Sequence, residues 1–291
     1  MSKHYGKEKG ISDINLEVYA GETFGFLGPN GAGKTTTIRT ILNFIKPSEG
    51  SVEVLGLDSV KDSTEIHKKI GYLPGELELF SQMNGKDFLK YMANLRGGVD
   101  WGFVEEMISN LKAQTTKPIG SLSHGNKQKL GLIQAFMHDP DILILDEPTN
   151  GLDPLVQEEF HKMLKSVKDS DKTVFLSSHI MSEVEEICDR VGIIREGELI
   201  AVEKIEDLKA KKLQSIEIHF AKSVPDNIFE NLPNVSDVEI KDNVVKAKVS
   251  GTNTLDSFIK TIAKYEVTKI DAPEPNLEEI FLSYFKGDKN E

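Results

Sequence analysis

The chain has little of what secreted, membrane-spanning or nucleic-acid-binding proteins require. It contains one cysteine, Cys188, so no disulfide can form within it, which suits a reducing compartment. No apolar run approaches the length of a membrane span, and the N-terminal residues lack the pattern of a signal peptide. Its 35 basic and 47 acidic side chains give a formal charge of −12, which repels nucleic acid and anionic lipid over long range.

The 291 residues, 38% of them hydrophobic, are enough for two domains with a core each. The run 141–146 is typical of a buried parallel strand that ends in carboxylates, and several shorter apolar runs are typical of further strands. We therefore predict an α/β domain over 1–205 with a helical insertion over about 80–137. The apolar stripes of the insertion are expected to be core, for example Phe88, Tyr91, Met92 and Leu95.

The remaining residues, 206–291, are predicted to form a linking helix and a small accessory domain. Strand and helix patterns follow in the order β-α-β-β-α-β, which indicates a ferredoxin-like α+β fold. A final helix is expected from Asn276, with Glu279 at the capping-box position. The expected hairpin strand 244–249 has no aromatic residue for base stacking, so an RNA-binding sheet is disfavoured.

Residues 28–35 match the pattern G-x-x-x-x-G-K-[ST], a phosphate loop between an apolar strand and the start of a helix. Glycine lets backbone N–H groups curl around phosphates, and the positive end of the following helix faces them. Lys34 is expected to reach the β- and γ-phosphates of a nucleoside triphosphate, and Thr35 to bind Mg²⁺. The predicted nucleotide-binding residues of this segment are Gly28, Pro29, Asn30, Gly31, Ala32, Gly33, Lys34, Thr35 and Thr36.

Two acidic residues, Asp146 and Glu147, end the apolar strand 141–146. A carboxylate at that place can hold Mg²⁺, either directly or through water. A second carboxylate directly after it faces differently, so it can orient and polarise the attacking water. We therefore predict that Asp146 is a metal ligand together with Thr35, and that Glu147 is a catalytic residue.

Three further segments complete a recognisable set of motifs. Residues 122–128 read LSHGNKQ before the acidic strand, residues 150–154 read NGLDP after it, and the next strand ends in Ser177-Ser178-His179. With the phosphate loop and the two acids, they resemble the nucleotide-binding subunit of an ABC transporter over about residues 3–205. The resemblance implies a P-loop NTPase core: a RecA-like parallel sheet with an antiparallel β subdomain and a helical insertion.

In that family two subunits close head to tail on two ATP molecules, so the resemblance implies a homodimer. Ser123 and Gly125 would cap the γ-phosphate from across the dimer. His179 resembles the switch histidine that contacts the γ-phosphate and is predicted to be catalytic. Asp153 resembles the loop aspartate that couples the two sites, and Tyr5 resembles the aromatic residue that stacks on adenine.

The chain departs from the family pattern at three places. The signature normally reads LSGGQ, and here His124 and Asn126 replace a glycine and the glutamine, although ATP binding is expected to survive. Gly75 stands where a glutamine is usual, so Glu76 is predicted to serve as metal ligand and sensor instead. The family also has a full strand before Tyr5, so a missing or shortened edge strand is expected.

The C-terminal domain resembles that of ATPases that serve separately encoded permeases of exporters for drugs, peptides, lipids or ions. The predicted function is therefore that of an ATPase that dimerises on ATP and Mg²⁺ and drives an integral-membrane permease. It would lie in the cytoplasm, on the inner face of the cell membrane, without a nucleic-acid partner. A soluble ABC ATPase outside transport and a nucleotide-gated regulatory subunit with little turnover are the alternatives, and the cargo depends on the permease.

Overall fold

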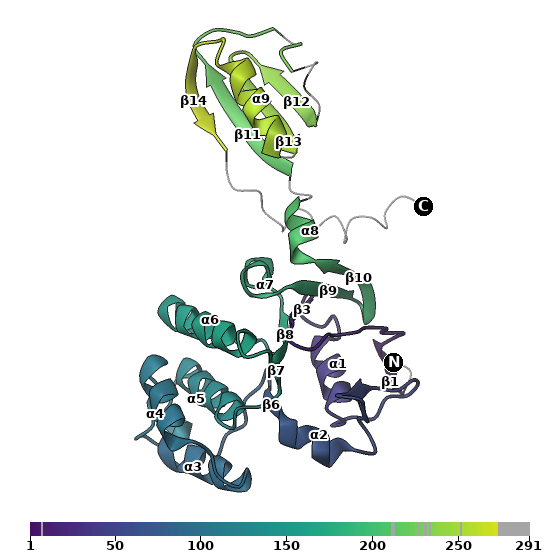
Figure 1. Cartoon of the computed structure of the whole chain (residues 1–291), viewed down its shortest axis with the longest axis vertical. Coiled ribbons are helices and arrows are strands. Elements are labelled where there is room, and N and C mark those ends of the chain that lie inside the picture. Colours follow the sequence, from purple (N-terminus) through teal and green to yellow (C-terminus); the bar gives the residue numbers. More distant parts are fainter. Residues whose placement is uncertain are drawn as a thin grey trace. The chain divides into compact units, whose positions relative to one another are not determined.

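The computed structural model describes residues 1–6, 8–210, 213–225, 227–229, 232, 234–250 and 252–272 (Figure 1). The chain divides into two compact units, residues 1–204 and residues 205–291, and each is described by itself. No helix of the described ranges is long and apolar enough to cross a membrane. The final helix expected from Asn276, with its capping residue Glu279, lies outside the described residues.

A six-stranded sheet forms the centre of the first unit, with strand order β10-β9-β3-β8-β7-β6. All neighbours are parallel except the hairpin of β9 and β10, which turns at Glu196-Gly197. The strands are β3 (Thr23–Leu27), β6 (Ile70–Leu73), β7 (Ile142–Asp146), β8 (Thr173–Ser178), β9 (Arg190–Arg195) and β10 (Glu198–Lys204). Because parallel strands end at the same edge, Leu27, Asp146 and Ser178 lie along one edge of this sheet.

Helices cover both faces of this sheet, which explains why its central strands β3 and β8 are buried throughout. Phe24 and Phe26 of β3 belong to the same apolar cluster as Ile38 of α1. Gly25 points to the opposite face, where a Cβ would lie 2.7 Å from Cγ1 of Val184 in α7. The helices are α1 (Lys34–Ile41), α2 (Ser63–Lys69), α6 (Pro154–Lys168) and α7 (Met181–Ile187). In Figure 1, α1 and α6 lie on opposite sides of the sheet.

The helical insertion follows β6 and returns to the sheet at β7. It consists of α3 (Gly85–Leu95), α4 (Trp101–Asn110), the 3-10 turn η1 (Ile119–Ser121) and α5 (His124–Phe136). The expectation that the stripe beginning at Phe88 is all core is wrong, because Tyr91 is 44% and Leu95 is 64% exposed. The face buried against α5 is instead formed by Gly85, Phe88, Leu89 and Ala93. Apolar residues of α3 lie on several of its faces, so the helix that packs against it decides which face is buried.

Short antiparallel pairs form the remainder of the first unit: β1 (Lys3–Tyr5) with β2 (Glu8–Ile11), and β4 (Glu53–Val54) with β5 (Leu57–Asp58). The apolar run 11–18 is a strand only at its first residue. Ile14 exchanges two backbone hydrogen bonds with Met1, at 2.7 and 2.9 Å, but no strand ladder continues past it in the described part of the chain. An open cavity of about 730 Å³ lies beside residues 14–20 and 51–56.

The second unit begins with α8 (Ile205–Ala210) and contains a four-stranded antiparallel sheet of order β12-β13-β11-β14. This order confirms the ferredoxin-like expectation, because the first and third strands of the domain are central. Its elements are β11 (Leu213–Phe220), β12 (Val235–Lys241), β13 (Val244–Ser250), α9 (Thr252–Ile262) and β14 (Val267–Asp271). Phe229 stacks on Phe258 of α9 with ring centroids 4.5 Å apart, although residues 227–229 form a turn where a short helix was expected.

Candidate active site

The phosphate loop joins β3 to α1, and two of its glycines are required by geometry. Gly33 has φ +107°, in the left-handed region that glycine adopts without a Cβ penalty. At Gly28 a Cβ would lie only 2.4 Å from the backbone oxygen of Ile194 in β9. The loop can therefore lie against the sheet edge only because these two positions have no side chain.

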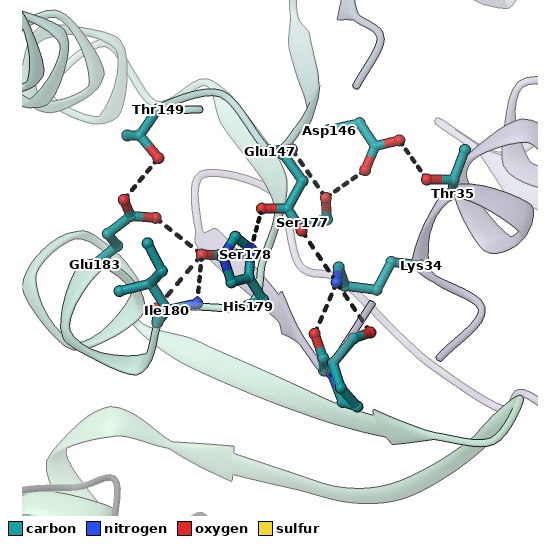
Figure 2. Close-up of polar contacts among 12 residues, drawn as sticks. Lys34, Thr35, Asp146, Glu147, Thr149, Ser177, Ser178, His179, Ile180 and Glu183 are labelled. Carbon is teal, nitrogen blue, oxygen red and sulfur yellow. Dashed lines mark hydrogen bonds and ion pairs between the residues drawn. The ribbon is translucent and has the colours of Figure 1, made fainter. Parts of the chain in front are cut away.

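Lys34, the first residue of α1, points back along its own loop (Figure 2). Its ammonium group donates to the carbonyl oxygens of Gly28 at 2.7 Å and Pro29 at 3.3 Å. It also forms an ion pair with Oε1 of Glu147 at 3.0 Å, and its side chain is only 6% exposed. A buried cation needs such partners, and each of these oxygens holds a place that a phosphate oxygen could take.

Asp146 lies at the end of β7 with its carboxylate fully buried between two hydroxyl groups. Thr35 donates to Oδ2 at 2.7 Å, and Ser177 of β8 donates to Oδ1 at 2.5 Å. Hydroxyl and carboxylate oxygens are the donors that Mg²⁺ prefers. Thr35 and Asp146, which the sequence placed in one metal site, are therefore in direct contact and have the right chemistry for it.

Glu147 lies between the phosphate loop and the end of β8 (Figure 2). Its φ of +51° turns the chain sharply after β7, and its N–H donates to Oγ of Ser177 at 3.0 Å. One carboxylate oxygen meets Lys34, and the other lies 2.7 Å from Nδ1 of His179. The two predicted catalytic residues, Glu147 and His179, are thus brought together in one chain, together with the phosphate-loop lysine.

The signature segment begins α5, away from the phosphate loop of the same chain. Ser123 caps the helix by accepting from the N–H of Asn126 at 3.4 Å, and both Ser123 and His124 are exposed. No hydrogen bond or ion pair between described residues joins Ser123 to 28–36. A Cβ on Gly125 would lie 2.5 Å from the backbone oxygen of Gly151, so the start of α5 packs directly on the loop after Glu147.

The remaining predicted residues lie around this centre. Asp153 caps α6 by accepting from the N–H of Val156 at 3.1 Å. Tyr5 is 47% exposed on β1, with its ring against Gly10, whose carbonyl oxygen lies next to Gly33. Glu76 is exposed, and it is the backbone at Gly75 that approaches the Asp146 carboxylate. The roles of these three side chains stay predictions.

Four polar residues of the site were not predicted to act there: Gln128, Thr149, Ser177 and Glu183. Gln128, 1% exposed, donates to the backbone oxygens of Glu147 at 3.3 Å and Pro148 at 3.0 Å. Ser177 contacts both adjacent acids, and Glu183 accepts from Thr149. A serine or glutamate in a helix or strand end gives no sequence signal of its own, although Ser177 directly precedes the motif residues Ser178 and His179.

Comparisons with known proteins agree with this geometry. Residues 11–150 match a family model described as ABC transporter, and residues 204–285 match one described as ATP-binding protein DrrA1-3-like, C-terminal domain. The bacitracin transport ATP-binding protein BcrA of Bacillus licheniformis is 34% identical, covering 99% of this chain and 96% of that protein. The linearmycin resistance ATP-binding protein LnrL of Bacillus subtilis is 31% identical, covering 97% and 96%.

Solved structures show the same fold. The structure of an ATP binding subunit of an ABC transporter matches with a TM-score of 0.66 at 26% identity, covering 72% of this chain and 89% of that one. The dimeric structure of MJ0796, a bacterial ABC transporter cassette, matches with a TM-score of 0.64 at 23% identity, covering 70% and 95%.

Fold and site thus define a phosphate-loop ATPase with an ATP-binding-cassette core, which confirms the expected fold class. The chain belongs to the ABC transporter family, as an ATP-binding and ATP-hydrolysing subunit. ATP binding and a membrane permease as partner follow from that membership.

The close approach at Gly28 leads to a first prediction. Gly28→Ala should weaken ATP binding roughly 5- to 150-fold, the equivalent of about 1–3 kcal/mol of overpacking strain. Equilibrium titration with ATP measures this. The matched control is Gly102→Ala, at a helical glycine whose Cβ would meet only the Asp100 side chain, at 3.2 Å. Unchanged affinity for Gly28→Ala would contradict the requirement for glycine at the sheet edge.

Proposed function

We propose that this subunit forms a head-to-tail homodimer on ATP and Mg²⁺, and that the dimer drives an exporter. The observation that carries the catalytic part is the position of Glu147, whose carboxylate contacts both Lys34 and His179. A carboxylate between a phosphate-binding lysine and a histidine is within reach of the water that attacks the terminal phosphate. Glu147 then orients and polarises that water.

The phosphates of ATP replace the present partners of Lys34. In the structure the ammonium group contacts the carbonyl oxygens of Gly28 and Pro29 and the carboxylate of Glu147. A triphosphate offers more negative charge at the same place, so Lys34 exchanges these contacts for phosphate oxygens and Glu147 is released toward the water. Thr35 and Asp146 would hold Mg²⁺, which supplies charge neutralisation between the phosphates.

His179 takes part as a hydrogen-bond partner on the opposite side of Glu147 from Lys34. Its Nδ1 faces the carboxylate, which orients the ring and leaves Nε2 for another partner. An oxygen of the γ-phosphate is the partner that we propose. This role gives His179 a contact made in the ATP-bound state, in addition to the contact with Glu147.

The homodimer is supported by the signature segment. Ser123 begins a 13-residue helix at an exposed position, where the positive helix end and the hydroxyl group suit a phosphate. The phosphate of the same chain has its own loop at α1, so the ligand of Ser123 would be the ATP of a second subunit. Asp153, on the loop that packs against Gly125, would lie at the same interface.

Export is supported by the relatives. BcrA is a bacitracin transport protein and LnrL a linearmycin resistance protein, and both align along nearly the whole of this chain. The match to the DrrA1-3-like C-terminal domain covers most of the second unit. We propose that this subunit likewise powers removal of a compound from the cell, from a cytoplasmic position on the membrane, with the permease selecting the compound.

The permease would dock on an exposed apolar patch on the helical insertion, formed by Phe80, Tyr91 and Leu95. These residues are 53%, 44% and 64% exposed, and the rings of Phe80 and Tyr91 pack edge to face at 5.6 Å. Exposed apolar patches of this kind are typical of protein interaction sites. Phe80 lies five residues after Gly75, and the backbone at Gly75 approaches the Asp146 carboxylate. A short segment of chain therefore connects the patch to the site.

Glu147→Gln tests the catalytic role. The variant should bind ATP with Mg²⁺ but hydrolyse it about 10²- to 10⁴-fold more slowly, because it loses the carboxylate that polarises water. It should also accumulate as a dimer with ATP, which size-exclusion chromatography measures. Turnover at the wild-type rate would rule out Glu147 as the catalytic carboxylate.

Head-to-tail sharing predicts complementation between two inactive variants. Ser123→Arg damages the signature, and Lys34→Ala damages the phosphate loop, so each homodimer has no intact site. A mixed dimer has one intact site, which pairs the phosphate loop of the first variant with the signature of the second. ATPase activity should therefore rise on mixing, and nucleotide-dependent crosslinking should report the mixed dimer. Crosslinked mixed dimers without any recovery would count against shared sites.

The docking patch is tested by Phe80→Ser combined with Tyr91→Ser. Both side chains are exposed, so the isolated subunit should keep its fold and its basal ATPase rate within about twofold. Co-purification of a membrane protein from solubilised membranes should be lost. Val60→Ser, an exposed apolar residue outside the insertion, is the control. Retained co-purification by the double variant would place the permease contact elsewhere.

A further inference from the structure

Glu183, in the first turn of α7, joins the loop that carries Glu147 to the end of β8, which directly precedes His179 (Figure 2). Its Oε1 accepts a hydrogen bond from Oγ1 of Thr149 at 2.6 Å, and its Oε2 accepts one from Oγ of Ser178 at 2.8 Å. Thr149 lies two residues after Glu147, and Ser178 directly precedes His179. One carboxylate therefore spans the gap between the loop after β7 and the end of β8.

Both hydroxyl groups depend on this carboxylate. Thr149 is 6% and Ser178 1% exposed, so neither hydroxyl has free access to water. The Ser178 oxygen accepts from the N–H of Ile180 at 2.9 Å, and the better placed acceptor for its proton is Glu183, since the carbonyl of Ile180 is 3.4 Å away. An ionised carboxylate accepts at both oxygens, which suits two donors at short distances.

The position of this bridge along the strands gives it a function. The ladder between β7 and β8 ends with the pair Asp146 and Ser177. Beyond that pair no strand ladder between described residues joins the two segments of the chain. The contact between Glu147 and His179, at 2.7 Å, lies in this region. Glu183 connects the loop after β7, through Thr149, with Ser178, the last residue of β8.

We propose that Glu183 is a positioning residue for ATP hydrolysis, which sets the distance between the carboxylate of Glu147 and the ring of His179. This inference rests on the roles proposed above for those two residues. Glu183 contacts neither Lys34 nor Thr35, so it acts on the chemical step and not on the binding of the nucleotide. Small displacements of catalytic groups reduce rates strongly, whereas binding through the phosphate loop is unaffected.

The test compares two substitutions of Glu183 in the full-length protein. Glu183→Ala removes both acceptors, and kcat for ATP should fall about 10- to 100-fold while KM stays within about threefold. Glu183→Gln keeps both hydrogen bonds if one hydroxyl accepts from the amide, so its kcat should stay within about threefold of wild type. Glu186→Ala is the control, with the same charge change on the same helix but an ion pair to His161.

A double-mutant cycle with Thr149→Val separates positioning from a general effect on stability. If Glu183 acts through Thr149, adding Thr149→Val to Glu183→Ala should not reduce kcat further, although Thr149→Val alone reduces it. Thermal unfolding shows whether each variant folds. Should Glu183→Ala not fold, the decision rests on Thr149→Val, whose kcat should fall at unchanged KM.

Two results would overturn the proposal: a kcat for Glu183→Ala within twofold of wild type, or a loss carried by KM alone. Glu147→Gln in the same assay distinguishes this failure from failure of the proposed function. Normal turnover by Glu147→Gln would refute the catalytic assignment itself. A stalled Glu147→Gln beside a normal Glu183→Ala would refute only the positioning role.

Discussion

The carboxylate of Glu147 is the group on which the site depends, because it contacts a residue from each of two other segments. Lys34 comes from the start of α1, after β3, and His179 from the loop after β8. These segments meet because β3, β8 and β7 are parallel neighbours that end at one edge. The parallel sheet thus creates the site. It places the ends of three neighbouring strands side by side, so residues that are far apart in the sequence lie within hydrogen-bonding distance.

The two buried charges of the site each have partners within the chain. Lys34 is buried, and two carbonyl oxygens and one carboxylate surround its charge. Asp146 is likewise buried between the hydroxyls of Thr35 and Ser177. Leaving either charge without partners would cost several kcal/mol, so these contacts stabilise the subunit. In the proposed function, ATP and Mg²⁺ would exchange one set of oxygen contacts for another, so the affinity would reflect only the difference between the two sets.

The residues of the phosphate-loop motif could be recognised in the sequence, and the side chains that connect the loops of the site could not. Gly28, Gly33 and Lys34 are recognisable because the spacing of the loop follows from backbone geometry around phosphates. Glu183 is recognisable only once α7 is placed beside β8, since it connects the nearby Ser178 with Thr149, which comes from a distant segment. The buried face of α3 was also missed, because helical spacing alone does not say which of several apolar faces meets α5.

Three contacts from the two helices α5 and α7 hold the loop 147–153, and they connect the signature segment with the residues around the phosphate loop. Glu183 accepts from Thr149, Gln128 of α5 donates to the backbone of Glu147 and Pro148, and Gly125 packs against Gly151. α5 also carries Ser123, which faces a second subunit in the proposed dimer. If α5 moves when Ser123 binds the ATP of a second subunit, it must therefore also move or strain the loop that carries Glu147.

The altered signature lies at the same contact, because the His124 ring packs on Gly151, where a Cβ would lie 2.4 Å from Nδ1. With His124 in that place, residue 151 has to be glycine, which its φ of +75° also favours.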